Sequence, residues 1–131
     1  MLDVHSYNHR RGGPDAPPEP WDENPEVNVG TGTLDRARFG TVADRFVAEL
    51  GEAWVAGHRL DVRENVRFRG GAFSRWVNEE YAGRGCALAI ECKKIFMDEW
   101  TGVADDAHVV ALGDALRDTL PILRRALAER S

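Results

Sequence analysis

The sequence predicts an α/β protein in which helices are layered against one sheet. Short apolar strands alternate along the chain with segments whose apolar residues recur at helical spacing. The clearest strand pattern is CALAIEC at 86–92, and helical stripes fall in 41–56 and 106–130. Because ligands of such sheets sit outside the carboxyl ends of the strands, polar side chains at strand ends are the first candidates for a functional site.

The first 33 residues combine a short strand with a long turn-rich segment. Met1–His5 is predicted to be a strand that ends in polar side chains. Residues 11–33 are predicted to be a long loop, because four prolines fall between positions 14 and 20 and glycines flank them. A loop of this length in a small domain is typically functional or disordered. Within it, 26–29 is a candidate strand.

A helix is predicted over Thr41–Ala56. Its apolar stripe recurs every four residues, at Val42, Phe46, Leu50 and Trp54. Thr41 and Asp44 resemble an N-terminal capping pair, and Gly57 is expected to end the helix.

The second half continues the alternation. Leu60–Val62 is predicted to be a strand and Ala72–Tyr81 a short helix. Cys86–Cys92 is the strongest strand of the chain. A helical stripe then spans Asp106–Arg130, and Pro121 is expected to kink or break that helix near its middle.

Composition favours one small cytoplasmic domain. The chain has 131 residues, of which 43% are hydrophobic, enough to bury a core. A net charge of −5 gives no electrostatic reason to expect nucleic acid or an anionic membrane as a partner. There is no apolar run of membrane-spanning length and no signal peptide at the start. Cys86 and Cys92, about 20 Å apart on one strand, are too distant for a disulfide and are expected to be buried thiols.

His5 is the first candidate for chemistry. It ends the first strand and shares a strand face with Asp3, so a carboxylate could orient its imidazole as it does for metal-bound histidines. A hydrogen-bonded histidine without a metal is the structural alternative.

Glu91 is the second candidate. It lies on the strand face that carries the small residues Ala87 and Ala89, which leave room for a ligand. A carboxylate at the end of an apolar strand is partly desolvated, which raises its pKa toward values useful for general acid–base catalysis. The alternative is an ion pair with Lys93, Lys94 or an arginine.

Arginines gather in the segment 63–75, around Gly70 and Gly71. A guanidinium suits a substrate carboxylate because it forms a planar bidentate contact. The candidate substrate contacts are Asn65, Arg67 and Arg75 here, together with His9. Asp98 and Glu99 form a further acidic pair, for which a helix or a turn packed by neighbouring apolar residues is the simplest interpretation.

Three stretches together resemble N-formylglutamate amidohydrolases: DVHSYNHRR at 3–11, ENVRFRGGAFSRW at 64–76 and ALAIECKKIFMDEWTG at 87–102. The resemblance covers nearly the whole chain, as the C-terminal part of one such domain over residues 1–131. It implies a three-layer sandwich with a mixed, mostly parallel sheet, phosphorylase/hydrolase-like and incomplete in this chain.

The resemblance also implies roles for individual residues. His5 would be the third zinc ligand, and Glu91 would be the general base that activates the zinc-bound water and passes its proton to the leaving nitrogen. His9 would be a substrate contact or a substitute ligand. The implied reaction cleaves N-formyl-L-glutamate to formate and L-glutamate.

The sequence departs from the family at one decisive point. The family holds zinc with a histidine and a glutamate of an upstream HxxE motif, and none of the histidines here has a glutamate three residues on. We therefore expect an incomplete zinc site, and either self-association or pairing with a missing N-terminal half. A non-catalytic binding module for acidic amino acids, and a zinc hydrolase for another N-acyl amino acid, are the alternatives.

Overall fold

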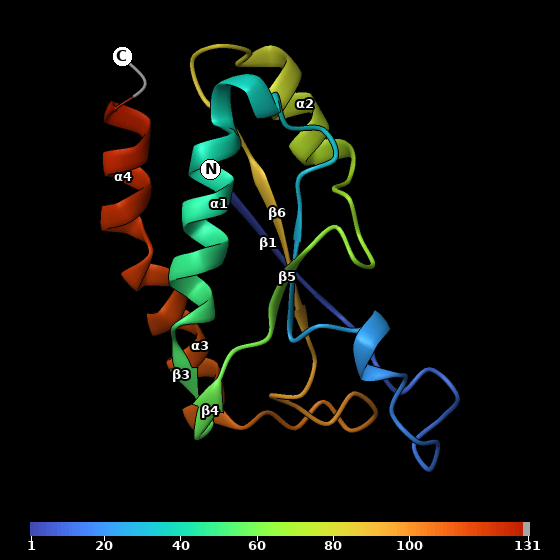
Figure 1. Cartoon of the computed structure of the whole chain (residues 1–131). Helices are drawn as coiled ribbons and strands as arrows, with labels where there is room; N and C mark the ends of the chain where they lie inside the picture. Colours follow the sequence, from blue (N-terminus) through green and yellow to red (C-terminus); the bar gives the residue numbers. More distant parts are fainter. Residues whose placement is uncertain (130–131) are drawn as a thin grey trace.

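Four strands form one mixed sheet in the computed structural model, which describes residues 1–129 (Figure 1). β1 (Leu2–Tyr7) runs parallel to β6 (Leu88–Lys93), and β2 (Val27–Gly30) runs parallel to β5 (Val62–Glu64). The antiparallel pairing of β2 with β6 joins the two pairs in the order β1-β6-β2-β5. The predicted α/β class and the mixed, mostly parallel sheet are confirmed. β1 stands at one edge of the sheet.

The apolar face of the sheet packs against three helices. α1 (Arg36–Gly51), α3 (Asp106–Asp118) and α4 (Leu120–Ala128) lie on the same side of the strands (Figure 1). Alternation along each strand sends every second side chain toward these helices, where burial of apolar area stabilises the fold. This core joins strand and helix residues: Val27, Val29, Leu88, Ile90, Cys92, Phe39, Phe46 and Leu50.

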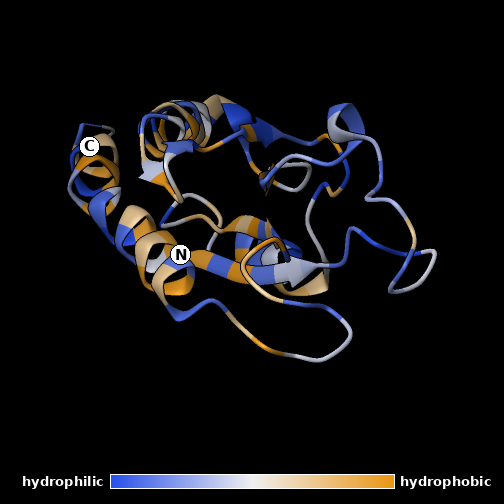
Figure 2. Ribbon diagram, turned by 90° about the horizontal axis from the view of Figure 1, so that it is seen from below, coloured by the Kyte–Doolittle hydropathy of each residue, from blue (hydrophilic) through white to orange (hydrophobic). Residues whose placement is uncertain are grey.

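The opposite face of the sheet is polar. α2 (Ala72–Glu80) covers it at the end where β6 begins, and the Asn78 side chain binds both backbone groups of Ala87 there (Figure 1). Loops cover the rest. The segment after β1, which includes the short 3-10 helix η1 (Trp21–Glu23), extends away from the layers and is mainly blue and white in Figure 2.

The helix predicted over Thr41–Ala56 begins and ends five residues earlier in the structure, as α1. α1 begins after Asp35, whose carboxylate accepts a hydrogen bond from the backbone N–H of Arg38 at 3.2 Å, so Thr41 lies inside the helix. The segment after the helix forms a hairpin between β3 (Trp54–Val55) and β4 (His58–Arg59). Its two-residue turn, Ala56–Gly57, has positive φ at both positions, as tight hairpins require. Gly57 therefore serves this turn and does not end the helix.

Most other elements follow the predictions within a few residues. The helix over 106–130 is broken as expected: α3 ends at Asp118, and Pro121 lies in the first turn of α4, where a missing N–H costs nothing. The predicted end at Arg130 lies outside the described residues. The predicted loop 11–33 contains η1 and β2. Both cysteines are buried, and neither forms a disulfide.

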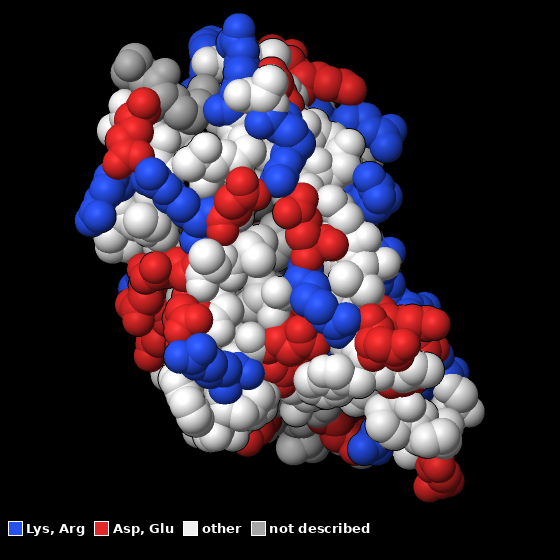
Figure 3. All heavy atoms as spheres, viewed as in Figure 1, with Lys and Arg blue, Asp and Glu red and all other residues white. Residues whose placement is uncertain are grey.

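Surface charges are mixed in sign. On the face drawn in Figure 3, acidic and basic side chains lie next to one another. Exposed ion pairs of the chain include Arg36 with Asp44 at 2.9 Å and Arg59 with Glu52 at 2.7 Å. Exposed pairs of this kind contribute little to stability. A search of the described helices found none with the length and hydropathy needed to cross a bilayer.

Candidate functional site

A row of polar residues crosses the polar face of the sheet. His5 on β1 is the direct neighbour of Glu91 on β6, Glu91 is the neighbour of Asn28 on β2, and Asn28 is the neighbour of Arg63 on β5. Neighbours in register point to the same face of a sheet, so the two main sequence candidates, His5 and Glu91, lie side by side. The sequence predicted a face for each residue, and strand pairing brings the two together.

Asp3 orients His5 as expected for two residues on one strand face. Asp3 Oδ1 lies 2.7 Å from His5 Nε2. The Asp3 side chain is 11% exposed, whereas that of His5 is 53% exposed, because β1 is an edge strand. The imidazole is thus fixed by a sheltered carboxylate while its ring stays open to solvent or to another polypeptide.

Glu91 is partly buried, and the pKa of its carboxyl group is shifted by its surroundings. Desolvation by the surrounding protein raises the pKa of Glu91, against an opposing effect of nearby His5. Among the described residues, no ion pair or hydrogen bond to its carboxylate is found. Lys93, the alternative partner, instead donates from Nζ to the backbone oxygen of Asn24 at 2.7 Å. Glu91 therefore carries a desolvated carboxylate that is available for proton transfer.

Asn28 attaches the arginine-rich loop to the sheet. It is fully buried, and its Oδ1 accepts from the backbone N–H groups of Arg67 at 2.8 Å and Phe68 at 3.2 Å. Its Nδ2 donates to the Phe68 oxygen at 2.8 Å. Gly30 allows the loop to come this close, because a Cβ there would lie 2.6 Å from the Gly70 nitrogen. The loop is thus held against the face that carries Glu91.

Two of the predicted substrate contacts are engaged within the protein. Asn65, at positive φ, accepts from the Thr31 N–H at 2.9 Å and donates to Thr31 Oγ1 at 2.8 Å. Arg67 donates to Asn24 Oδ1 at 2.8 Å and pairs with Glu19 at 3.0 Å, which binds the loop before β2. Arg75 is exposed on α2, and no ion pair of its guanidinium is found in the part of the chain that the structure describes. Of the three, Arg75 is the one whose side chain is left for a ligand.

His9 lies beyond the end of β1, next to Glu99 of the acidic pair noted in the sequence. Its Nδ1 is 2.6 Å from Glu99 Oε1, and the Glu99 side chain is 1% exposed. Glu99 Oε1 also accepts from the backbone N–H groups of His9 at 3.0 Å and Arg10 at 3.1 Å. Burial lowers the pKa of His9, which outweighs the opposing effect of Glu99. Burial thus favours the neutral form of the His9 imidazole, whereas the adjacent Glu99 carboxylate favours the charged form.

The side chains of residues 1–129 do not by themselves form a site that fits a catalytic zinc ion. A zinc ion of that kind takes three protein ligands and leaves one position for water. No three His, Cys, Asp or Glu side chains in this range come together in a way that could hold a metal ion. His5 is one potential ligand, with Asp3 as its orienting carboxylate.

Comparison with known proteins bears on the fold. No family model and no curated protein matches the sequence. A solved structure, that of N-formylglutamate amidohydrolase from Ralstonia eutropha JMP134, superposes with a TM-score of 0.57 and is 20% identical in sequence. The match covers 95% of this chain and 43% of that one. This chain shares the fold of an N-formylglutamate amidohydrolase. The resemblance predicted from the sequence motifs is confirmed at the level of the fold, over less than half of the longer chain.

The sequence analysis did not predict the contacts of three residues near the site. Asn28 stands between two valines in a predicted strand, and a polar residue there could have indicated a tie to a loop. Lys93 is 3% exposed and stacks its ammonium 3.4 Å from the centre of the Trp21 ring. Glu99 was interpreted as part of a helix or a turn. Lys93 and Glu99 gave no local signal, because their partners lie 69 to 90 positions away along the chain.

Proposed function

We propose that this chain provides the general base and one zinc ligand of an amidohydrolase that acts on an N-acyl amino acid. The observation that carries the proposal is the adjacency of His5 and Glu91 on one face of a sheet whose fold is that of an N-formylglutamate amidohydrolase. N-formyl-L-glutamate, cleaved to formate and L-glutamate, is the proposed substrate. The complete domain would be a three-layer sandwich of the phosphorylase/hydrolase-like type.

Glu91 is the proposed general base. Amide hydrolysis needs a group that takes a proton from the attacking water and returns it to the leaving nitrogen. The raised pKa of Glu91 makes its carboxylate a better proton acceptor than an exposed one, and no cation holds it in an ion pair among the described residues. Its neighbours Ala87 and Ala89 are small, but they are buried beneath α2 and the loop around Gly70, so the space expected beside them is filled by the protein.

Arg75 is the proposed contact for a substrate carboxylate. Its guanidinium is exposed, in contrast with that of Arg67, which is bound to Asn24 and Glu19. Asn65 and Arg67 would act indirectly, by holding the loop 65–71 against the sheet. His9 remains a further proposed contact beyond the end of β1.

The remaining zinc ligands would come from another polypeptide segment, either a separate N-terminal half or a second copy of this chain. His5 is on the open edge of the sheet, where an added strand could pair with β1. Beside that edge, Val4, Val109, Leu112 and Leu116 line an apolar hollow of about 330 Å³.

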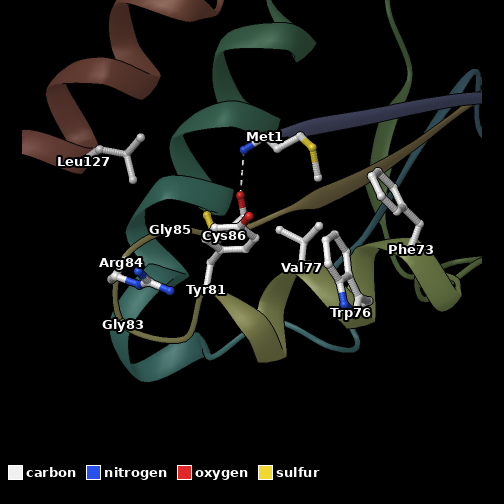
Figure 4. A pocket seen from close by; sticks show the side chains of 10 residues that line it. All are labelled: Met1, Phe73, Trp76, Val77, Tyr81, Gly83, Arg84, Gly85, Cys86 and Leu127. Atoms are coloured by element: carbon white, nitrogen blue, oxygen red, sulfur yellow. Dashed lines mark hydrogen bonds between the residues drawn. The ribbon is translucent and has the colours of Figure 1, made fainter.

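A larger hollow lies where β1 begins. Phe73 and Trp76 of α2 and the following Tyr81 line it together with Met1, over about 630 Å³ (Figure 4). Exposed apolar surface beside an edge strand and at its start is typical of a contact with another polypeptide. More than half of the similar solved chain lies outside the match, which fits a partner of this kind.

A non-catalytic binding module is the second candidate. It is favoured by the lack of a three-ligand metal cluster in residues 1–129. Such a module would bind an acidic amino acid through the arginine-rich loop without hydrolysing an amide. With either function, a cytoplasmic location is proposed.

Zinc content of the purified chain is the deciding measurement, with His5→Ala as its partner variant. About one zinc per chain or per dimer that His5→Ala removes would support the zinc hydrolase. Hydrolysis of N-formyl-L-glutamate, N-formyl-L-aspartate and N-acetyl-L-aspartate would then identify the substrate. A chain that holds no zinc, but binds L-glutamate, would favour the binding module.

A further inference from the structure

β1 leaves one edge of the sheet open along its whole length. It has six residues and pairs with no described strand other than β6, whereas β5, at the opposite edge, has three. An open edge presents unpaired N–H and C=O groups to a further strand, and proteins that stay monomeric interrupt such edges with proline, a bulge or a very short strand. β1 has none of these, because its register with β6 is unbroken from Leu2 to Tyr7 and includes no proline.

The outward-facing backbone groups of β1 belong to alternate residues. The Met1 oxygen accepts from the Leu88 N–H at 3.0 Å, at one end of the pairing with β6. The Tyr7 oxygen accepts from the Lys94 N–H at 3.0 Å, at the other end. Because backbone groups alternate in direction along a strand, the odd-numbered residues of β1 all face β6. The groups directed at the open edge are those of Leu2, Val4 and Ser6.

The two faces of β1 differ in character, as the alternating orange and blue bands of this strand in Figure 2 show. Val4 is 51% exposed and borders the hollow of about 330 Å³ that Val109 and Leu112 of α3 also line. Asp3 and His5 lie on the polar face, with their side chains 2.7 Å apart. A strand that pairs with β1 therefore needs an apolar side chain beside Val4 and polar side chains that complement Asp3 and His5.

A second copy of β1 meets these needs in one antiparallel register. A two-fold axis at Val4 places this residue opposite the partner's Val4, and Leu2 opposite the partner's Ser6. All three residues direct their backbone groups at the open edge, so each pair exchanges its backbone hydrogen bonds. Asp3 then lies opposite the partner's His5, in a pair without backbone bonds whose Cα atoms are about 4.5 Å apart. Side chains of opposite charge in such a pair stabilise the contact between two strands.

Shifted registers lose this match. With the axis at Asp3, the two Asp3 carboxylates would face each other, and like charges directly opposite destabilise a pair of strands. With the axis at His5, the two imidazoles would face each other, and Asp3 would lie opposite the partner's Tyr7. The side chains of β1 therefore favour the register with its axis at Val4.

We propose that a second copy of this chain pairs with β1 in this register and extends the sheet across a two-fold axis. The two Val4 side chains meet on the helical side, between the hollows of the two copies. On the polar side, the partner's Asp3 brings a second carboxylate to His5. The inference rests on the proposed function only in that it names the polypeptide that covers the open edge beside His5.

Cysteine cross-linking of the whole chain tests the register. Val4→Cys places two thiols across the axis, with Cα atoms about 5.5 Å apart, a distance that a disulfide can span. Ser6→Cys is the matched control, because the two Ser6 Cα atoms are about 14 Å apart in this register. Under mild oxidation, Val4→Cys should form a disulfide-linked dimer at least about tenfold faster than Ser6→Cys. The unmodified chain should form none, since both of its cysteines are buried. Equal rates for the two variants, or no dimer from Val4→Cys, would overturn the proposal.

A pair of charge variants tests the contact of Asp3 with the partner's His5. His5→Asp would set carboxylates opposite each other in its own dimer, and Asp3→Lys would set an ammonium opposite an imidazole. Each variant alone should therefore dimerise at least roughly threefold more weakly than the unmodified chain in sedimentation experiments. An equimolar mixture should recover the dimer, because every carboxylate of one variant then faces a cationic or imidazole group of the other. A mixture that associates no better than the separate variants would refute the pairing.

These outcomes distinguish the dimer from the proposed function, since neither experiment measures zinc or hydrolysis. A chain that does not cross-link through Val4 overturns the dimer and leaves a separate N-terminal half as the polypeptide that covers β1. A chain that cross-links through Val4 but holds no zinc supports the dimer and contradicts the zinc hydrolase.

Discussion

Replacement of Asn28 by alanine should detach the arginine-rich loop from the sheet and destabilise the protein. The amide makes three hydrogen bonds, all to the backbone of Arg67 and Phe68, and it is fully buried. At about 1 kcal/mol for each bond, Asn28→Ala should reduce the free energy of unfolding by about 3 kcal/mol. That is a large share of the roughly 5–15 kcal/mol expected for a domain.

Urea denaturation measures this loss, and Asn8→Ala is the matched control. Asn8 is exposed, and its side chain makes no hydrogen bond with the described residues, so its replacement should change stability by less than about 0.5 kcal/mol. Native-state hydrogen exchange adds a local test: the amides of Arg67 and Phe68 should exchange faster in Asn28→Ala. A stability loss below about 1 kcal/mol, or unchanged exchange at these two amides, would refute the reasoning.

Three further changes test the site and the edge of the sheet. Because the pKa of Glu91 is raised in the folded state, ionised Glu91 destabilises the fold. Glu91→Gln should therefore stabilise the protein near neutral pH, and this gain should vanish as the pH falls below the pKa of Glu91 in the unfolded state. Thermal unfolding measured over a range of pH tests both expectations. The His58 imidazole donates a hydrogen bond to the Glu26 carboxylate, which raises the pKa of His58. His58→Ala should therefore destabilise the protein more at about pH 5 than at about pH 9, and the same loss at both values would contradict this. Val4 is 51% exposed on the edge strand and should support self-association of the chain. Val4→Lys should shift the chain toward monomer in sedimentation experiments. An unchanged distribution of monomer and oligomer would exclude β1 as the contact.

Local sequence patterns predicted the type of each helix and strand more accurately than the residues at which it begins and ends. The alternation in 86–92 placed Ile90 and Cys92 in the core and Glu91 on the other face, because a strand has a period of two. The helix limits near Thr41 were wrong, since the cap at Asp35 lies outside the apolar stripe that was used to find the helix. The stripe itself extended too far, because Trp54 belongs to a hairpin and is exposed.

The site was predictable only where a single strand determines it. The contact of Asp3 with His5 follows from their spacing on one strand. The adjacency of His5 and Glu91 depends on the pairing of β1 with β6, which are separated by the eighty residues 8–87, and no local pattern fixes such a register. The engagement of Asn65 and Arg67 within the protein likewise depends on distant partners, Thr31 and Asn24, so an arginine-rich motif could not distinguish ligand contacts from loop contacts.

The position of His5 on an edge strand gives a structural context for the lack of an HxxE motif in this sequence. An orienting carboxylate is in place at Asp3, and a desolvated carboxylate lies one strand inward at Glu91, yet the ring of His5 is half exposed. A histidine whose ring is oriented by a sheltered carboxylate, but is half exposed at the sheet edge, suits a site that a second polypeptide completes. The same edge is flanked by apolar hollows on the helical side and at the start of β1. Because a partner that pairs with β1 would cover these surfaces and reach His5 in the same step, assembly and metal binding should be coupled: zinc should strengthen association of the chain, and His5→Ala should abolish that effect without abolishing association itself.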